Sequence, residues 1–134
     1  MSWVNEYTGI PFKKSGIGFD GTFCWGLVVL VYCYRRGIIL PDYDGCLGQG
    51  SDADLRRVLG IIETESGKWF KVKQPKELDV VLFRTGILNR HIGIALDHYR
   101  MLHVDKGIKS CVQRFNSLAW KYKLIGFYRY DEKR

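Results

Sequence analysis

A cysteine and two histidines are the residues of this chain whose types and spacing suit a chemical step. Cys24 follows a glycine-punctuated loop and begins a long apolar run, and His91 and His103 lie in a later, β-rich part of the chain. A thiolate is a strong nucleophile, an adjacent imidazole takes up its proton, and a second polar group orients that imidazole. The three residues predict nucleophilic catalysis, with Cys24 as nucleophile, His91 as general base and acid, and His103 as the orienting group.

Each of these residues also has an ordinary structural interpretation. Cysteine is among the most buried residue types, so Cys24 by itself suits a core position. A buried histidine with both ring nitrogens hydrogen-bonded would equally explain His91 and His103. His98 lies beside Asp97 in a predicted turn and is expected at the surface. Only the convergence of the cysteine with the two histidines distinguishes catalysis from packing.

The cysteine pattern gives no sign of a metal site. The chain has four cysteines, which are Cys24, Cys33, Cys46 and Cys111. None of them forms the C-x-x-C pair of a structural zinc site, and the predicted chemistry needs neither a metal nor another cofactor. Residues 1–6 contain no basic region followed by an apolar segment, so we expect no signal peptide, synthesis in the cytoplasm and reduced thiols. Action outside the cell would then require another means of delivery.

A helix over residues 24–36 is predicted to position the cysteine. Its buried stripe, at helical spacing, is expected to comprise Leu27, Val28, Val31 and Tyr34. Its β-branched residues also suit a strand, but a run of about a dozen residues favours a helix. Gly37 predicts the C-cap, and Pro41 prevents continuation. Cys24 then lies in the first turn, where free N–H groups and the helix dipole favour a thiolate.

The rest of the chain predicts one more helix and then a run of strands. After a loop over 42–50, a second helix is expected from Ser51, with the apolar stripe Leu55, Val58, Leu59 and Ile62. Strands are predicted at 69–72, 79–84, 90–96, 100–104, 109–115 and 124–130. Their close spacing implies an antiparallel meander. Helices followed by strands indicate a single α+β domain over residues 1–134.

Strand periodicity predicts which sheet face carries the histidines. Side chains alternate between faces, so Ile92 and Ile94 share one face while His91 and Gly93 share the other. If the strands at 90–96 and 100–104 pair through their short turn, His91 and His103 lie on the same face. The small residues on that face would let the helix that carries the cysteine approach closely.

The charge balance limits the classes of partner without choosing one. The chain has 21 Lys and Arg against 14 Asp and Glu, a net charge of +7. This excess favours an anionic partner, such as a nucleic acid, a membrane surface or an acidic cell-wall polymer. No recognition-helix or RNA-binding strand motif is present, which argues against a nucleic-acid module. The longest apolar run ends at Arg35 and is too short to span a membrane.

Several segments stand in a fixed order along the chain. They are Tyr7–Phe12, Cys24–Val28, Asp79–Phe83, His91–Ile94 and Met101–Val104, followed by the ending Gly126–Arg129. In this order they resemble the NlpC-type cell-wall cysteine peptidases, especially the short form found in bacteriophage tail proteins. The resemblance implies a papain-like α+β core, with the nucleophile opening a central helix packed on an antiparallel sheet of about five to six strands.

The same resemblance implies an activity and assigns residues to it. The activity is hydrolysis of amide bonds in peptidoglycan stem or cross-linking peptides, with phage tail proteins as further partners and a phage particle as the means of delivery. By position the nucleophile falls on Cys24, the base on His91 and the third polar residue on His103. Tyr7 matches a tyrosine near the nucleophile that helps polarise the substrate carbonyl, and the Cys24 N–H would contribute to an oxyanion hole. Phe23 replaces an aspartate that the family usually carries, which would alter the loop or substrate binding.

Two other functions stay open on the sequence. A phage tail assembly or structural protein that keeps the fold without turnover would account for Phe23, although the intact Cys24, His91 and His103 set argues against it. An acyltransferase or effector amidase on the same core is a further alternative, but such relatives often carry the histidine before the cysteine. A paired thiolate alkylates well below the pH expected for a free cysteine, so reactivity against pH would separate the enzyme from the structural protein.

Overall fold

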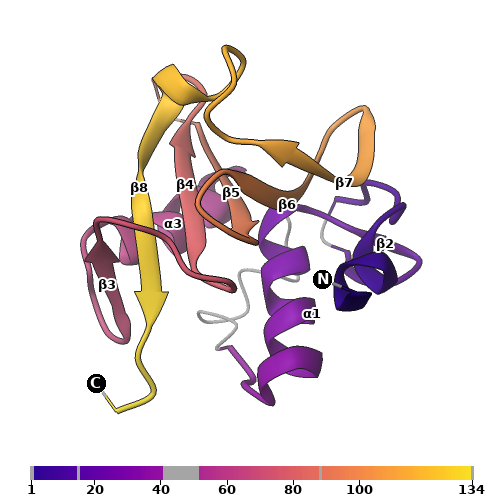
Figure 1. Ribbon diagram of the computed structural model, residues 1–134, viewed down its shortest axis with the longest axis horizontal. Coiled ribbons are helices and arrows are strands. Elements are labelled where there is room, and N and C mark those ends of the chain that lie inside the picture. The colour runs from indigo at the N-terminus through magenta and orange to yellow at the C-terminus, as the bar shows by residue number, and fades with distance from the viewer. Residues whose placement is uncertain (1, 15, 41–51, 88, 134) are drawn as a thin grey trace.

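The computed structural model describes residues 2–14, 16–40, 52–87 and 89–133. It confirms an α+β fold, with helices packed on a six-stranded antiparallel sheet and a small two-stranded sheet beside them (Figure 1). The chain begins with a 3-10 helix (Ser2–Tyr7), the short strands β1 (Ile17–Gly18) and β2 (Gly21–Thr22), and the helices α1 (Cys24–Arg36) and α3 (Asp52–Glu63). The strands of the large sheet are β3 (Trp69–Val72), β4 (Val80–Arg84), β5 (Arg90–Ala95), β6 (Arg100–Asp105), β7 (Ile108–Arg114) and β8 (Leu124–Tyr130).

The strand order of the large sheet is β3-β8-β4-β5-β6-β7, and every neighbouring pair is antiparallel. Strands β4 to β7 form the predicted meander. The prediction of one continuous meander is wrong for β3, because β8 lies between β3 and β4. The segment between β7 and β8 carries the chain from the β7 edge back across the sheet, so the last strand pairs far from its neighbour in sequence (Figure 1).

Helix α1 has the predicted bounds and the predicted cap. Gly37 adopts the left-handed conformation at φ 64, and its N–H bonds to the carbonyl of Cys33 at 3.1 Å. The predicted burial of Tyr34 is wrong, because this side chain is 66% exposed and contacts the exposed ring of Phe19. Tyr32 is fully buried instead. The first turns of α1 are enclosed almost all round, so one apolar stripe does not describe its buried surface.

Helix α3 covers the predicted second helical segment. Val58, Leu59 and Ile62 are fully buried, as the apolar pattern predicts, and the helix packs on β5 and β3. The predicted cap at Ser51, the loop over 42–50 and Cys46 lie outside the described residues, as does the side chain of Leu55.

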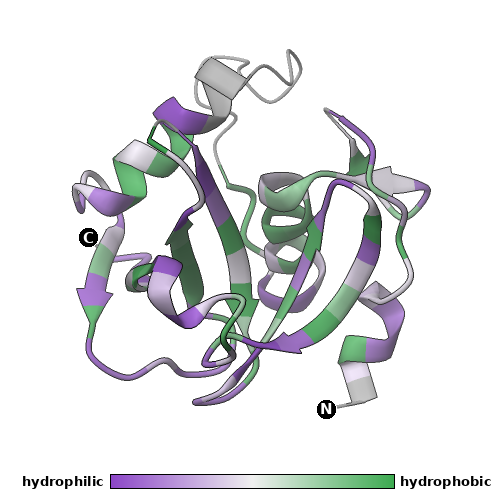
Figure 2. Cartoon of the chain, turned by 90° about the horizontal axis from the view of Figure 1, so that it is seen from above, coloured by the Kyte–Doolittle hydropathy of each residue, from purple (hydrophilic) through white to green (hydrophobic). Residues whose placement is uncertain are grey.

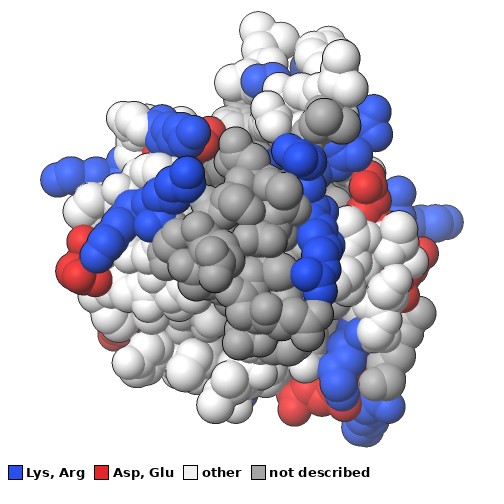
Figure 3. Space-filling view, turned by 180° about the vertical axis from the view of Figure 1, so that it is seen from behind, with Lys and Arg blue, Asp and Glu red and all other residues white. Residues whose placement is uncertain are grey.

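The central strands β4, β5 and β6 of the large sheet are buried on both faces. One face joins α1 in the main core, where Ile92 and Ile94 pack with the helix residues Leu27 and Val28. In Figure 2 the hydrophobic positions of α1 and the neighbouring strands lie toward the centre of the molecule. The opposite face holds a second cluster formed by Val81, Phe83, Ala95, Met101 and Phe115. Figure 3 shows Lys and Arg spread over the back of the molecule with Asp and Glu among them.

On the face of β5 that carries His91, side chains from β6 pack over Gly93, and helix α1 does not. Helix α1 packs on the Ile92 face, so the predicted close approach of α1 over Gly93 is wrong. A Cβ atom at Gly93 would lie 2.9 Å from the Met101 sulfur and 3.3 Å from the His103 Cβ. The small residue is therefore needed because two β6 side chains occupy the space above it.

Candidate active site

Cys24 is the first residue of α1 and lies against strand β5. Its residue surface is only 6% exposed, and α1 packs on both β5 and β6. The backbone N–H groups of Ile92 and Trp25 are hydrogen-bonding partners of its sulfur. The sulfur therefore meets β5 at the residue that directly follows His91.

The large sheet opens where the first turn of α1 reaches it. Within the part of the chain that the structure describes, β5 and β6 share only the pairs Ile94↔Leu102 and Ala95↔Met101. Toward Arg90 the ladder between them ends, while β5 stays paired with β4 as far as Arg90. Ile92 can therefore offer its N–H to the sulfur rather than to a β6 carbonyl.

His91 and His103 are brought together as the strand periodicity predicts. His91 Nε2 and His103 Nδ1 are 2.8 Å apart, and the two rings meet edge to face with centroids 5.1 Å apart. Both residues are buried, with His91 4% and His103 0% exposed. His103 Nε2 in turn lies 2.6 Å from Gln113 Oε1 on β7. The histidines thus form a directly bonded pair with a further polar partner.

Aromatic rings enclose this pair on the side away from α1. The Trp120 ring stacks on His91 with centroids 5.1 Å apart and an interplanar angle of 23°, and its edge contact with His103 is 5.2 Å between centroids. Phe83 touches both His91 and Trp120. Trp120 also donates its indole N–H to Gln113 Oε1 at 3.2 Å. Sequence reasoning missed Gln113 and Trp120, and the only signal for either was the pair of aromatic residues, Trp120 and Tyr122, between the predicted strands at 109–115 and 124–130.

Burial decides the charge state of the site. It raises the pKa of the Cys24 thiol to about 12, although the N–H groups of Ile92 and Trp25 act in the opposite direction. Burial, followed by the proximity of His103, lowers the pKa of His91 to about 4, and burial lowers the pKa of His103 as well. These directions favour a neutral thiol and neutral imidazoles in the free protein, against the thiolate expected at the helix start.

Tyr7 lies toward the other end of α1. Its buried ring contacts Trp3 and Phe19, and its carbonyl accepts a hydrogen bond from Ser110 Oγ at 2.6 Å. Phe19 in turn touches Tyr34, which the rise of an α-helix separates from the first residue of α1 by about 15 Å. These contacts do not bring the Tyr7 ring to the cysteine, and a role for Tyr7 in substrate binding stays a prediction.

Phe23, which replaces the usual aspartate, occupies the N-cap position of α1. It is 7% exposed, and its side chain makes no capping hydrogen bond to the helix. Its backbone N–H donates to the Gly16 carbonyl at 3.2 Å, and its own carbonyl accepts the Thr22 hydroxyl at 3.0 Å. The ring belongs to the core, so residue 23 offers no side-chain acceptor to the N–H groups of the first turn.

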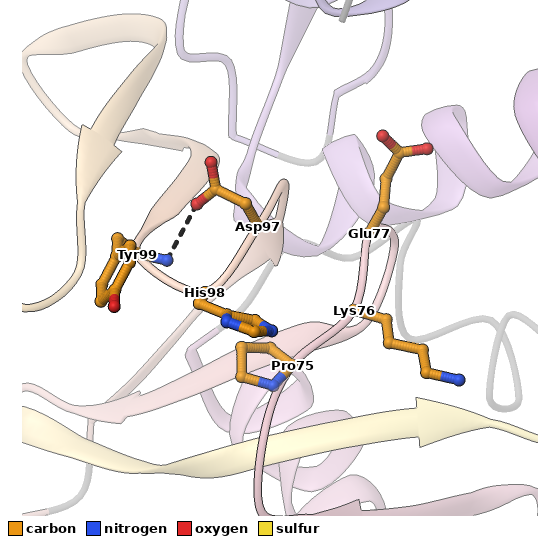
Figure 4. A pocket seen from close by; sticks show the side chains of 6 residues that line it. All are labelled: Pro75, Lys76, Glu77, Asp97, His98 and Tyr99. Atoms are coloured by element: carbon orange, nitrogen blue, oxygen red, sulfur yellow. Dashed lines mark hydrogen bonds between the residues drawn. The ribbon is translucent and has the colours of Figure 1, made fainter.

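His98 is exposed, as predicted, and lies apart from the other two histidines. It lines a surface depression of about 450 Å³ together with Pro75, Lys76, Glu77, Asp97 and Tyr99 (Figure 4). The Asp97 carboxylate there accepts the backbone N–H groups of Tyr99 and Arg100 at 2.8 Å each. A second depression of about 480 Å³ lies over β3 and β8. Neither of these two depressions includes Cys24 or the bonded histidines.

Among the described residues, the thiols, the possible metal ligands and the helices give no sign of a disulfide, a metal site or a membrane span. Cys24, Cys33 and Cys111 are free thiols. Over the described ranges, no group of three or more His, Cys, Asp and Glu side chains is arranged to share a metal ion. None of the helices described here is both long enough and apolar enough to cross a bilayer.

Comparison of the sequence with known proteins finds a family and a relative. The model of the NlpC/P60 family matches residues 9–129. The Escherichia coli K12 protein "Murein DD-endopeptidase MepS/Murein LD-carboxypeptidase" is 24% identical over 136 aligned positions. That alignment covers 100% of this chain and 60% of the relative, so the chain spans well under the full length of that protein.

Comparison of the fold finds solved structures of the same architecture. A lipoprotein-like NLP/P60 protein of Staphylococcus aureus has a TM-score of 0.64 at 22% identity, covering 94% of this chain and 38% of that one. The NlpC/p60 domain of the peptidoglycan hydrolase SagA has a TM-score of 0.58 at 22% identity, with 88% of both chains covered. These likenesses agree with the α+β fold described above.

Proposed function

Because the chain belongs to the NlpC/P60 family, we propose that it is a cysteine peptidase that hydrolyses amide bonds in peptidoglycan stem or cross-linking peptides. The observation that carries the proposal is a cysteine at the start of α1, bonded to the backbone beside His91, with His91 bonded to His103. The names of the relatives support the substrate class, since one is a murein endopeptidase and another a peptidoglycan hydrolase.

The first half of the proposed reaction forms a thioester. His91 takes the proton from the Cys24 thiol as the sulfur attacks the carbonyl carbon of the scissile amide. The backbone N–H of Cys24 and the first turn of α1 stabilise the resulting oxyanion. When the intermediate collapses, the carbon–nitrogen bond breaks and His91 gives its proton to the leaving amine.

The second half releases the acid product. Water attacks the thioester carbon while His91 removes one of its protons, and the returning sulfur recovers that proton as the carbon–sulfur bond breaks. The pKa of the thiol is raised and that of His91 is lowered, so proton transfer accompanies each attack rather than preceding it. His103 holds the imidazole in orientation, and Trp120 and Phe83 cover the histidines on one side.

The setting of the activity is also part of the proposal. A net charge of +7 suits approach to an anionic cell-wall polymer. Delivery by a phage or prophage tail, with tail proteins as partners, is supported by the resemblance of the ordered sequence segments to the short tail-associated form. A protein that uses the same fold only for tail assembly is the alternative, and Phe23 at the N-cap is the feature that favours it.

The deciding experiment is a digest of purified peptidoglycan, read by mass spectrometry of the released fragments. We expect new peptide termini with the wild-type protein and none with Cys24→Ala. Cys33→Ala is the matched control, because Cys33 is an exposed free thiol, and it should cleave like the wild type. Absence of cleavage by the wild type on walls of several stem-peptide chemistries would favour the structural alternative.

A further inference from the structure

We propose that Gln113 is a positioning residue of this catalytic centre. Its side-chain oxygen, held in place by Trp120, fixes the proton positions on both histidines so that His91 keeps Nδ1 as its proton-accepting atom. The inference rests on the proposed function for its catalytic meaning. Its structural content, the tautomers of two buried histidines, can be measured independently.

The Gln113 atom that faces the site is its carbonyl oxygen. One amide atom lies 2.6 Å from His103 Nε2 and 3.2 Å from Trp120 Nε1. An indole N–H can only donate, so the atom that faces it must accept. An amide nitrogen only donates, and the shared atom is therefore the carbonyl oxygen. Trp120 in this way settles the orientation of the amide.

This oxygen sets the proton positions along the hydrogen bonds from Gln113 to His103 and His91. Because the Gln113 oxygen only accepts, His103 Nε2 must carry a proton. A neutral imidazole has one N–H, so His103 Nδ1 then presents a lone pair. His91 Nε2, 2.8 Å from that lone pair, must be the donor. Neutral His91 is therefore unprotonated at Nδ1, as a general base requires.

The burial of both histidines favours their neutral states. Both are buried, and burial lowers the pKa of each. The charged groups that act on His91 are Asp105 from β6, which raises its pKa, and Lys123 from the second 3-10 helix (Lys121–Lys123), which lowers it. At His103 the Gln113 hydrogen bond and then Asp105 act to raise the pKa, but burial outweighs both and the pKa is lowered. The Gln113 side-chain amide is uncharged, so it orients His103 and His91 without adding a charge to the site.

Two features hold the Gln113 side chain although it is exposed. Met101 and Gln113 are register partners, and the side chain reaches diagonally to His103. The Trp120 N–H supplies a second bond to the same oxygen, while its ring stacks on His91. Trp120, in the connection between β7 and β8, thus contacts both Gln113 and His91. Water is therefore less able to take the place of the Gln113 amide.

The kinetic test compares Gln113→Leu, Gln113→Glu and Gln74→Leu on a peptidoglycan-derived peptide. Leucine removes the acceptor, and we expect kcat to fall by about 10- to 100-fold with KM little changed. Glutamate keeps an acceptor at this point, so most of kcat should return. Its charge favours the protonated imidazoles, so the acid limb of the pH profile should move upward. Gln74, an exposed glutamine in the turn before β4, is the matched control and should leave kcat unchanged.

The second test measures the tautomers directly by nitrogen-15 NMR of the histidine rings in Cys24→Ala. We expect both His91 and His103 to carry the proton on Nε2, and His103 to lose this preference in Cys24→Ala with Gln113→Leu. An Nδ1–H tautomer of His103 in the parent would overturn the proposal. So would equal loss of kcat in the leucine and glutamate variants without a change of the pH profile. A protein that lacks hydrolase activity but has the expected tautomers would refute the proposed function alone.

Discussion

At Cys24 two physical effects act on the thiol in opposite directions. The first turn of α1 and the N–H groups of Ile92 and Trp25 favour the thiolate, whereas burial disfavours any charge. Burial is the larger effect and raises the pKa to about 12. In the proposed mechanism, Cys24 and His91 would therefore be neutral before substrate binds, and His91 would act as a general base.

Alkylation of Cys24 tests this charge state. In a background with Cys33, Cys46 and Cys111 changed to Ser, we expect iodoacetamide to react slowly at neutral pH and faster as the pH rises. A pKa of about 12 instead of 9.0 leaves on the order of a thousandfold less thiolate at neutral pH. A variant that retains only the exposed Cys33 is the control and should react faster. Rapid alkylation of Cys24 below neutral pH would instead indicate a resting thiolate–imidazolium pair.

The pH profile of kcat/KM tests the neighbours of His91. In the proposed mechanism His91 accepts the thiol proton and must be unprotonated. Its pKa is lowered to about 4, so activity should persist into acid before it falls. Lys123 lowers this pKa, so Lys123→Gln should move the acid limb to higher pH. Asp105 raises it, so Asp105→Asn should move the limb to lower pH. Shifts in the same direction for both variants would contradict this electrostatic assignment.

Helix α1 is positioned through a close approach to the loop that precedes it. A Cβ atom at Gly26 would lie 2.2 Å from the Gly16 carbonyl oxygen and 2.7 Å from Thr22 Oγ1. The carbonyl is backbone and cannot turn away cheaply, so only glycine fits. The position of the helix start, and with it the position of Cys24, depends on this contact.

Substitution of helical glycines tests that dependence. We expect Gly26→Ala to lower the free energy of unfolding by about 1 to 3 kcal/mol, because the added methyl group clashes with backbone. Gly60→Ala in α3 is the matched control, since no atom lies within 4 Å of its added Cβ. It should raise the stability by up to about 1 kcal/mol through helix propensity. Chemical denaturation measures both, and equal effects would contradict the clash.

On the scale of the whole molecule, one ion pair joins β8, the last strand, to the turn that precedes β4. Arg129 in β8 donates Nε and Nη2 to the two carboxylate oxygens of Asp79 at 3.0 and 2.9 Å. Asp79 is 4% exposed and also accepts the Lys76 N–H. The pair joins β8 to the turn before β4, where the sequence order and the sheet order differ.

Removal of one partner should destabilise the whole fold. We expect Arg129→Gln to lower the free energy of unfolding by about 3 kcal/mol, because it leaves a buried carboxylate without its cation. Arg100→Gln is the control, since the Arg100–Asp97 pair is exposed and worth at most about 1 kcal/mol. Urea denaturation of both variants gives the comparison, and similar small losses would show that β8 is held by packing alone.

The sequence by itself determined the features that depend on local periodicity. Helical spacing and Gly37 fixed the bounds of α1, and period-two alternation placed His91 and His103 on one face of the sheet. The reason is that hydrogen bonds within a helix and side-chain alternation within a strand act between near neighbours. The α+β class followed from the order of these elements.

Only the tertiary structure decided which distant segments meet. It inserted β8 between β3 and β4, set α1 on the Ile92 face, and brought Gln113 and Trp120 to the histidines. It also buried Cys24 deeply enough to reverse the expected direction of its pKa. Packing partners and desolvation depend on contacts between residues far apart in the chain, and the spacing of residues along a sequence does not encode them.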